Sequence, residues 1–201
     1  MIITISGTAG SGKSSIAKII TKKLHAQRVY VGGMRRELAR KKGWTLEKLN
    51  EYAQTHHETD VDVDKEAAAE ARKLAKKGNV VVEGRTQFHF LPESIKIFIK
   101  VDLNTAAKRI WKDLQNKITK QERNEGDLKS LSEARREIQK RDHSDAKRYI
   151  KYYGFDHRDE LQYDFVIDTT KLTLEEVTKE IMGFIKKERL VTNRLSAHKV
   201  G

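Results

Sequence analysis

The stretch ISGTAGSGKSS, residues 5–15, decides the fold. Its glycines, lysine and serine fit the pattern G-x-x-x-x-G-K-[ST]. The apolar run IITIS precedes the pattern at residues 2–6, and apolar residues at helical spacing follow it at positions 16, 19, 20 and 24. A glycine-rich turn before a helix needs neither the lysine nor the serine. Because strand, loop, lysine, serine and helix all agree, we predict a phosphate-binding loop.

Each residue type in this loop has a chemical reason to be there. Glycines let the backbone wrap around phosphates, and the following helix adds the equivalent of about 0.5 positive charge at its N-terminus. Lys13 can reach the outer phosphates of a nucleoside triphosphate, and the Ser14 hydroxyl can ligate Mg²⁺. We therefore expect ATP with Mg²⁺ to bind here, through Gly7, Thr8, Ala9, Gly10, Ser11, Gly12, Lys13, Ser14 and Ser15.

Outward from the loop, short apolar runs alternate with long amphipathic ones. This alternation predicts an α/β domain with a parallel sheet. The expected strands are five, at residues 2–6, 28–31, 79–83, 96–101 and 163–168. The third, NVVVE, is nearly continuous in valine, as expected of a strand covered on both faces and lying beside the first.

The expected helices carry recognisable start and stop signals. Three segments have the Ser/Thr-x-x-Glu spacing of a capping box: Thr55 with Glu58, Ser130 with Glu133, and Thr173 with Glu176. We also expect a short helix over 34–43, a long one over 59–78 whose first turn carries Asp60, Asp62 and Asp64, and a helix capped by Asn104. The final residues, 189–201, lack periodicity and are expected to form a frayed tail after a single domain at 1–188.

Composition narrows the class of protein. Lys and Arg number 41 against 29 for Asp and Glu, which gives a formal charge of +12. The basic residues alternate with acids and do not interleave with aromatic residues, so we expect solvated helix faces and no nucleic-acid partner. The chain has no cysteine, no signal peptide is expected, and no stretch approaches a membrane span of about 20 apolar residues. These features favour a cytoplasmic protein.

The fate of the terminal phosphate separates the classes of phosphate-loop protein. A GTPase needs Asn-Lys-x-Asp, and the only Asn-Lys, in NKIT, lacks the acid. A motor ATPase usually needs a longer chain. A small kinase must bring two phosphate-bearing molecules together, which calls for converging arginines and a flap that excludes water.

The sequence supplies candidates for this task at strand ends and on one helix. Arg36 follows the second strand and Arg85 follows the third, at the sheet edge where ligands bind. Arg141 and Arg148 lie on the helix that returns from the polar segment 112–130. Glu83 ends the valine strand, where it can orient Mg²⁺ through water.

The chain resembles the cytidylate (CMP) kinases, and most of all their compact archaeal form. The resemblance rests on GTAGSGKSS, VGGMRRELA, VVVEGR, KRDHSDAKRYIKYYG and YDFVIDTT, and it covers roughly residues 1–185. It implies a five-stranded parallel sheet, an acceptor-binding region at about 32–78, and a lid at about 110–140. It also implies transfer of the γ-phosphate of ATP to CMP or dCMP with Mg²⁺. By this resemblance Arg36, Arg85, Arg141 and Arg148 hold phosphates, with Lys13 completing the catalytic set, Asp145 lies near the acceptor sugar or orients the arginines, and Arg109 lies near the ATP base.

The sequence departs from this family beside the acceptor. Family members often carry a serine near Val31, an acid near Gly33 and an aromatic residue near Arg35, and residues 86–90, TQFHF, also differ from the expected pattern. Asp62 or Asp64 could contact the acceptor base. The alternatives are therefore a kinase for AMP or another small acceptor and, from a different class, an ATP-dependent nucleic-acid-binding protein. We expect a monomer.

Overall fold

The computed structural model describes residues 1–116 and 128–197, the last seven of them by backbone alone. Five parallel strands form one sheet in the order β2-β3-β1-β4-β5. The strands are β1 (Ile2–Gly7), β2 (Gln27–Tyr30), β3 (Val80–Glu83), β4 (Ile95–Lys100) and β5 (Phe165–Asp168). All five lie within two residues of the predicted positions. The predicted α/β class and the position of the valine strand beside the first strand are confirmed.

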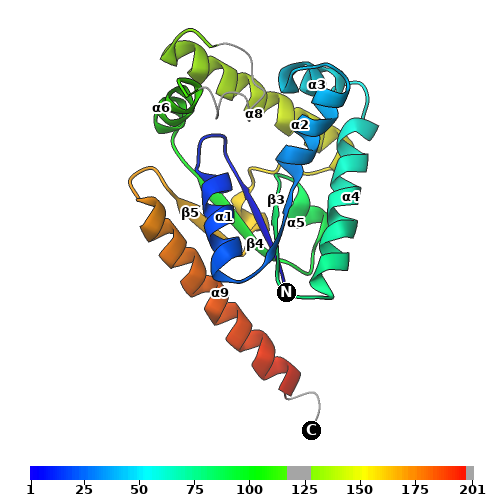
Figure 1. Ribbon diagram of the computed structural model, residues 1–201, viewed down its shortest axis with the longest axis vertical. Helices are drawn as coiled ribbons and strands as arrows, with labels where there is room; N and C mark the ends of the chain where they lie inside the picture. Colours follow the sequence, from blue (N-terminus) through cyan, green and yellow to red (C-terminus); the bar gives the residue numbers. More distant parts are fainter. Residues whose placement is uncertain (117–127, 198–201) are drawn as a thin grey trace.

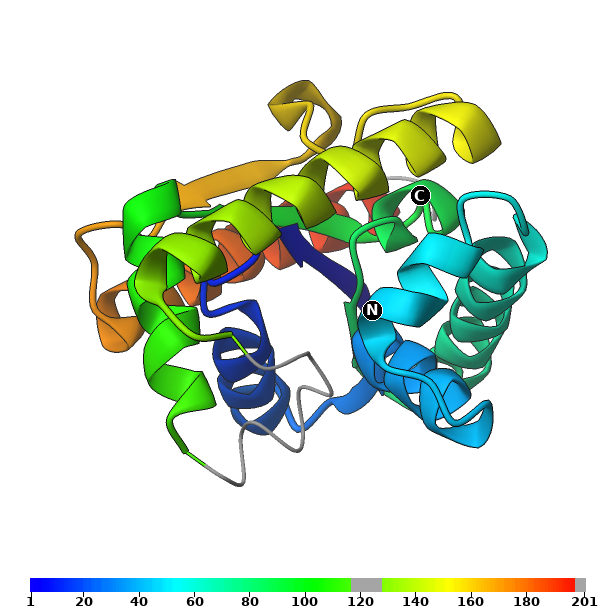
Figure 2. The same ribbon diagram turned by 90° about the horizontal axis from the view of Figure 1, so that it is seen from above.

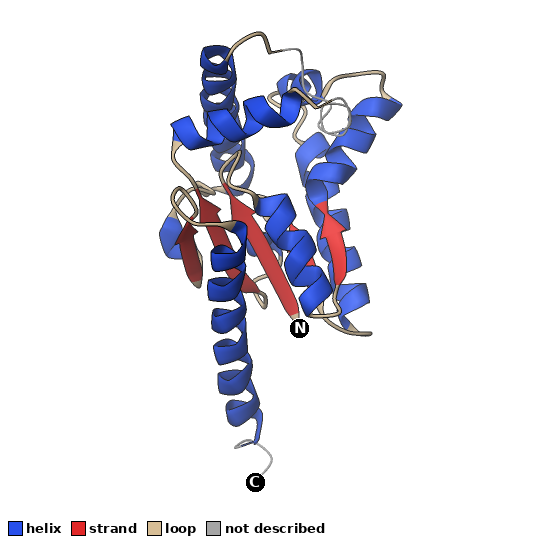
Figure 3. Cartoon of the chain, turned by 60° about the vertical axis from the view of Figure 1, so that its left-hand side comes forward, coloured by secondary structure: helices blue, strands red, loops and turns tan. Residues whose placement is uncertain are grey.

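Helices cover both faces of the sheet (Figures 1 and 3). One face packs against α1 (Lys13–Lys23) and α9 (Leu174–Ala197), which contribute Ile16, Ile20, Ile181 and Ile185 to a fully buried cluster. The opposite face packs against α4 (Glu58–Ala75) and the short α5 (Gln87–Phe90). The result is a three-layer α/β/α fold.

The central strand explains why both layers form. Every residue of β1 is buried, and successive side chains point to opposite faces of the sheet. Ile3 and Ile5 join the cluster beneath α1 and α9, whereas Ile2 joins the cluster beneath α4. The side of Ile2 also carries Thr4 and Ser6, whose hydroxyls hydrogen-bond to Ser94 Oγ and Arg85 O. Because the strand is buried on both faces, it lies at the centre, and the loop that follows it opens at the middle of the sheet edge.

The remaining helices gather above the carboxyl ends of the strands. Helix α8 (Leu131–Tyr153) runs across this edge and packs against α6 (Leu103–Leu114) on one side, while α2 (Val31–Lys41) and α3 (Leu46–Tyr52) rise on the other (Figures 1 and 2). A short 3-10 turn, η1 (Glu160–Gln162), precedes β5. Residues from α8 and from α2–α4 therefore face the phosphate loop.

Helix α2 begins three residues earlier than the predicted helix and follows β2 without a loop. Gly32 and Gly33 concealed this start, because glycine is a poor helix former. The reason for two glycines is the Tyr30 ring: a Cβ at Gly33 would lie 2.6 Å from Tyr30 Cδ1. Close packing of an aromatic ring therefore decides the sequence at this strand-to-helix junction.

The predicted caps have mixed outcomes. The Thr173–Glu176 box is complete, since each residue accepts the backbone N–H of the other. Ser130 caps α8 as predicted, but the Glu133 carboxylate accepts from Lys129 N–H instead.

The Thr55 prediction was wrong: its hydroxyl donates to Tyr52 O, and α4 starts after His57. Asp102, and not Asn104, caps α6, because its carboxylate accepts two N–H groups of the first turn.

Helix α9 continues to Ala197, so a frayed tail starting at residue 189 was wrong for residues 189–197. This stretch contains neither glycine nor proline, and a helix that is already formed continues through such residues at little cost. The predicted lid has its centre, residues 117–127, outside the described residues.

Candidate functional site

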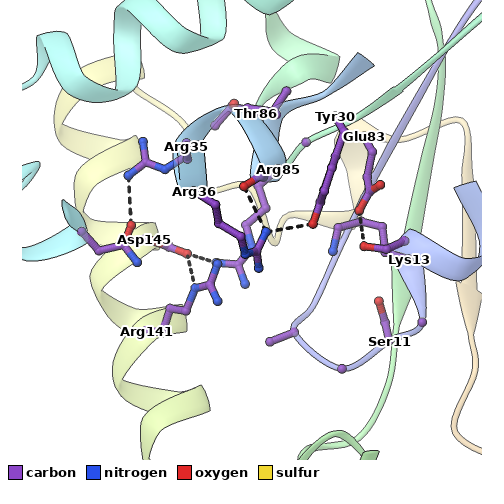
Figure 4. Close-up of a pocket in the computed structure, with 18 of the residues that line it drawn as sticks. Ser11, Lys13, Tyr30, Arg35, Arg36, Glu83, Arg85, Thr86, Arg141 and Asp145 are labelled. Carbon is purple, nitrogen blue, oxygen red and sulfur yellow. Dashed lines mark hydrogen bonds and ion pairs between the residues drawn. The ribbon is translucent and has the colours of Figure 1, made fainter. Parts of the chain in front are cut away.

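A cleft of about 340 Å³ lies where the carboxyl edge of the sheet meets α2, α4 and α8. The phosphate loop forms one wall, and charged side chains from β3, α2 and α8 form the other (Figure 4). Residues 9–15 of the loop line the cleft, while Gly7 and Thr8 lie beneath them: Thr8 N–H donates to Ile99 O at 3.1 Å.

The loop needs glycine at two tight approaches. Gly7 has φ of 149°, and a Cβ there would lie 2.1 Å from Ile99 O. Gly10 has φ of 73°, and a Cβ there would lie 2.8 Å from the Ala106 Cα of α6. These contacts press the loop against β4 and α6. Among the described residues, the buried Ser11 hydroxyl makes no hydrogen bond, as expected of a group that would meet a ligand.

Lys13 starts α1 and lines the cleft. Burial lowers the pKa of its ammonium from 10.5 to about 8; Glu83 opposes this lowering, whereas Arg85, Arg141 and Arg36 add to it. No carboxylate in the described parts of the chain forms an ion pair with Lys13. A buried cation among other cations is a strong site for an anion.

Ser14 and Glu83 form a pair of oxygen ligands next to Lys13. The Ser14 hydroxyl donates to Glu83 Oε1 at 2.5 Å, and the other oxygen, Oε2, forms an ion pair with Arg28 of β2. Glu83 is 2% exposed and ends β3 directly beside β1. A hydroxyl and a carboxylate at the base of a phosphate loop are the hard oxygen donors that Mg²⁺ prefers.

Three arginines converge on the middle of the cleft from separate elements (Figure 4). Arg36 comes from α2, Arg85 follows β3, and Arg141 comes from α8. Arg36 Nη1 donates to Tyr30 Oη at 2.8 Å and to Gly32 O at 3.0 Å, which fixes its guanidinium. The predictions placed all three beside a phosphate-bearing substrate, and the structure brings them together across from the loop.

Asp145 contacts two of these three arginines, Arg85 and Arg141. Its Oδ2 atom pairs with Arg85 Nη1 and lies 3.7 Å from Arg141 Nε, while Oδ1 accepts from Arg148 Nη2 at 2.6 Å. Arg148 differs from the prediction. Arg148 is 3% exposed and lies behind Asp145 instead of lining the cleft. Its Nε donates to Asp60 and its Nη1 donates to Ser144.

Arg109 fastens the loop at the other end of the cleft. Its guanidinium donates to Thr169 O at 2.8 Å, to Thr169 Oγ1 at 3.0 Å and to Gly10 O at 3.4 Å. Thr169 Oγ1 also donates to Ser11 O. Arg109 therefore ties α6 and the segment after β5 to the phosphate loop, on the side expected to hold the base of ATP.

The wall opposite the phosphate loop also carries acidic, aromatic and amide side chains. Asp64 was among the candidates from the sequence, and it lines the cleft, with Oδ2 accepting from Tyr153 Oη at 2.7 Å and Oδ1 from Gln87 Nε2 at 3.1 Å. Burial raises the pKa of Asp64. Asp62 is exposed instead. Lining residues that the sequence did not assign to the site include Tyr30, Asn50, Asp60, Asp113 and Tyr149, whereas Arg35 and Thr86 lie at positions expected to border the acceptor.

A signal for the buried acids was present in the helical period. Asp60 and Asp64 lie three residues before Val63 and Ala67, which belong to the apolar stripe of α4, so both acids face inward. The predicted acidic first turn does include Asp60, but its side chain and that of Asp64 are buried. Among the described residues, no cluster of three or more acidic, histidine or cysteine side chains could hold a metal by itself, and no helix is long and apolar enough to span a membrane.

Comparison with known sequences gives one consistent result. The profile of the cytidylate kinase-like family matches residues 2–171. The cytidylate kinase of Sulfolobus acidocaldarius is 37% identical over 194 residues, which cover 94% of this chain and 97% of the relative. The cytidylate kinase of Methanocaldococcus jannaschii is 36% identical over 177 residues, covering 88% and 93%.

Comparison with solved structures supports the fold. A shikimate kinase from Acinetobacter baumannii has a TM-score of 0.57 at 14% identity, covering 94% of each chain. A thymidylate kinase from Candida albicans has a TM-score of 0.53 at 15% identity, covering 94% of this chain and 92% of its own. An uncharacterised protein from Eubacterium ventriosum reaches 0.64 at 22% identity, covering 92% and 98%.

Proposed function

The chain belongs to the cytidylate kinase-like family, and on that premise we propose that it transfers the γ-phosphate of ATP to CMP or dCMP. The observation that carries the proposal is the cleft itself: a phosphate loop with Lys13 faces three converging arginines across one cavity. One anion site would serve for ATP binding alone. Two opposed cationic walls suit two phosphate-bearing molecules.

The proposed reaction is a direct transfer. An oxygen of the CMP phosphate attacks the γ-phosphorus of ATP, the bond from that phosphorus to the β,γ-bridging oxygen breaks, and CDP and ADP leave. The protein forms no covalent intermediate. Its residues align the two phosphates and balance their charge. Lys13 would bind the outer phosphates of ATP, and Arg36, Arg85 and Arg141 would bind the acceptor phosphate and the group in transfer.

Mg²⁺ fits the oxygen pair beside the loop. Ser14 would ligate it through the hydroxyl that now donates to Glu83, and the buried Glu83 carboxylate would hold one of its waters. Because Arg28 already neutralises part of the Glu83 charge, contact through water suits this carboxylate better than direct ligation. When bound, Mg²⁺ supplies positive charge to the phosphate oxygens of ATP. Glu83 and Ser14 would set its position.

The elements around the cleft divide between the two substrates. The acceptor would lie against the region at about 32–78, which contains α2, α3 and α4.

The lid at about 110–140 stays a prediction, as do the single domain over 1–188, the monomeric state and the cytoplasmic location. Arg109 would lie by the base of ATP, and Asp145 would orient Arg85 and Arg141 for the acceptor.

A coupled assay with Mg-ATP and a panel of acceptors tests the proposal. CMP and dCMP should support ADP formation far better than UMP, AMP or GMP. Preferential use of AMP would replace the proposed acceptor but keep the kinase chemistry. ATP hydrolysis that RNA or DNA stimulates, with no acceptor in the panel used, would contradict the proposal and favour a nucleic-acid-dependent ATPase.

A further inference from the structure

Along the arginine wall, buried and partly buried side chains form a row of alternating charge. The order is Arg35, Asp60, Arg148, Asp145 and then Arg85, contributed by α2, α4, α8, α8 and the segment after β3. Asp60 is 1% exposed, and Asp145 and Arg148 are each 3% exposed. The row joins α2, α4, α8 and the segment after β3, and we call this side of the cleft the acceptor wall. Asp60 is the member that links α4 to both α2 and α8.

We propose that Asp60 is a positioning residue for the acceptor: together with Arg148 it sets the guanidinium groups on the acceptor wall. We call the Asp60–Arg148 pair the brace. The proposal rests on the proposed function, because it assigns a role within the same cleft.

Both oxygens of Asp60 are committed to different arginines. Oδ1 pairs with Arg35 Nη1, and Oδ2 accepts from Arg148 Nε at 2.8 Å. Arg35 is further fixed by Asn50, whose Oδ1 accepts from Nη2 at 2.9 Å. Arg35, Asn50 and Asp60 all line the cleft. The guanidinium of Arg35 is therefore oriented by two acceptors before any substrate arrives.

The second carboxylate oxygen of Asp60, Oδ2, influences the phosphate-facing arginines indirectly, through Arg148. Arg148 is held by Asp60 through Nε and itself holds Asp145 through Nη2. Asp145 in turn contacts Arg85 and Arg141, which face the phosphates. If Asp60 loses its charge, Arg148 keeps only Asp145 and Ser144, and it can draw the Asp145 carboxylate away from the two arginines.

The charge balance explains why a carboxylate is needed at position 60. Arg35, Arg36, Arg85, Arg141 and Arg148 bring five guanidinium groups to this wall, together with the carboxyl groups of Asp60, Asp64 and Asp145. Of these acids, Asp60 and Asp145 form ion pairs with the arginines. Without the Asp60 carboxylate, the guanidinium groups of Arg35 and Arg148 would face one another, and Arg148 would keep Asp145 as its carboxylate partner. Removing one partner of a buried ion pair lowers stability as well as changing side-chain positions, so a second variant that keeps Asp60 is needed beside Asp60→Asn.

Asp60→Asn tests the brace, with Asp62→Asn as its matched control. Asp62 lies on the same helix, carries the same charge and is exposed. We expect D60N to raise the KM for CMP by about 10- to 100-fold, the range for losing charge-assisted hydrogen bonds, and to change the KM for ATP by less than about twofold. D62N should match the wild type. Equal rises of both KM values, or no rise for CMP, would overturn the proposal.

A double-mutant cycle separates positioning from loss of folding. Arg35→Gln leaves the brace intact and should raise the KM for CMP alone. Combined with D60N, its effect should be clearly smaller than the product of the two single effects, because the residues act together. Should D60N fail to fold, Arg148→Lys carries the test, because it keeps the positive charge but loses the bridge from Asp60 to Asp145, and an unchanged KM for CMP in R148K would overturn the proposal.

The two proposals can fail separately. If the wild type phosphorylates no acceptor, the proposed function fails, and the dissociation constant of CMP measured by calorimetry without ATP still compares D60N with D62N. If the wild type phosphorylates CMP while D60N and D62N behave alike, the kinase activity holds and the brace alone is wrong.

Discussion

The two walls of the cleft hold their positive charge in different ways. The donor wall is the phosphate loop with the start of α1. Its Lys13 ammonium has no ion-pair partner among the described residues, and burial lowers its pKa to about 8. On the acceptor wall, Asp60 and Asp145 already bind the guanidinium groups of Arg35, Arg148 and Arg85. The ammonium of the donor wall is therefore unpaired, whereas the acceptor wall pairs part of its positive charge with carboxylates and stays cationic.

This difference suits the two molecules that the walls would bind. ATP brings several phosphates and a magnesium ion, so an uncompensated ammonium and the N–H groups of a helix N-terminus bind it strongly. An acceptor monophosphate must be held at one defined place for attack. Paired arginines with fixed planes give that precision, because each guanidinium presents its donors as a rigid fork.

The largest expected effect follows from removing the unpaired ammonium. Lys13→Ala should reduce turnover by about 10³, because a preorganised cation that faces the transferring phosphate is lost. Steady-state rates with Mg-ATP and CMP measure the loss, with Lys18→Ala on the exposed part of the same helix as the control. A rate near that of the wild type would show that the unpaired ammonium has no part in the transfer.

Removing one arginine of the acceptor wall should reduce turnover less than Lys13→Ala does. Arg85→Ala should reduce turnover by about 10², because Arg36 and Arg141 remain in the cleft and Asp145 still has Arg148 as a partner. The KM for ATP should change little. A loss in R85A that falls on ATP binding, with unchanged handling of CMP, would contradict the division of the cleft into two walls.

The pH dependence gives the smallest effect and concerns the donor wall alone. Without nucleotide, the pKa of the Lys13 ammonium is lowered to about 8. Bound phosphates raise this pKa, so ATP binding above pH 8 takes up a proton. Affinity for ATP should fall by about tenfold per pH unit above 8. Calorimetry in buffers of different ionisation enthalpy measures the uptake.

A matched variant sharpens the pH experiment. Lys13→Arg keeps its charge up to high pH and should remove the fall in affinity, whatever its affinity at pH 7. Constant affinity of the wild type between about pH 7 and 9.5, with no proton uptake, would contradict the assignment of a shifted ammonium to the donor wall.

The same division explains how much the sequence could predict. The donor wall lies in one contiguous motif, and the five strands, the phosphate loop, Lys13 and Ser14 were all found from local pattern. Arg36, Arg85 and Arg141 were found because they follow strands or match a family pattern. These predictions need only short-range information, since a strand end or a loop has the same meaning wherever the chain goes next.

The ion pairs that fix the arginines of the acceptor wall could not be derived in this way. Asp60 pairs with Arg148, 88 residues away, and Arg35 pairs with Asp60, 25 residues away. The charges of Arg35 and Arg148 looked like those of a solvated helix surface. The helical period turns Asp60 inward, but only tertiary packing shows which arginines it meets. Gly32 and Gly33 concealed a helix start for a similar reason, because their role is to admit the Tyr30 ring.

The central claim is that the two walls bind two nucleotides at once, with their phosphates facing one another. Calorimetric titration with an analogue that joins adenosine and cytidine through a polyphosphate chain tests this most directly. We predict one bound analogue per chain, with an affinity about 10²–10⁴ times that for ATP, and a large loss of affinity in both Lys13→Ala and Arg85→Ala. Binding no tighter than that of ATP, or loss in K13A alone, would contradict the claim.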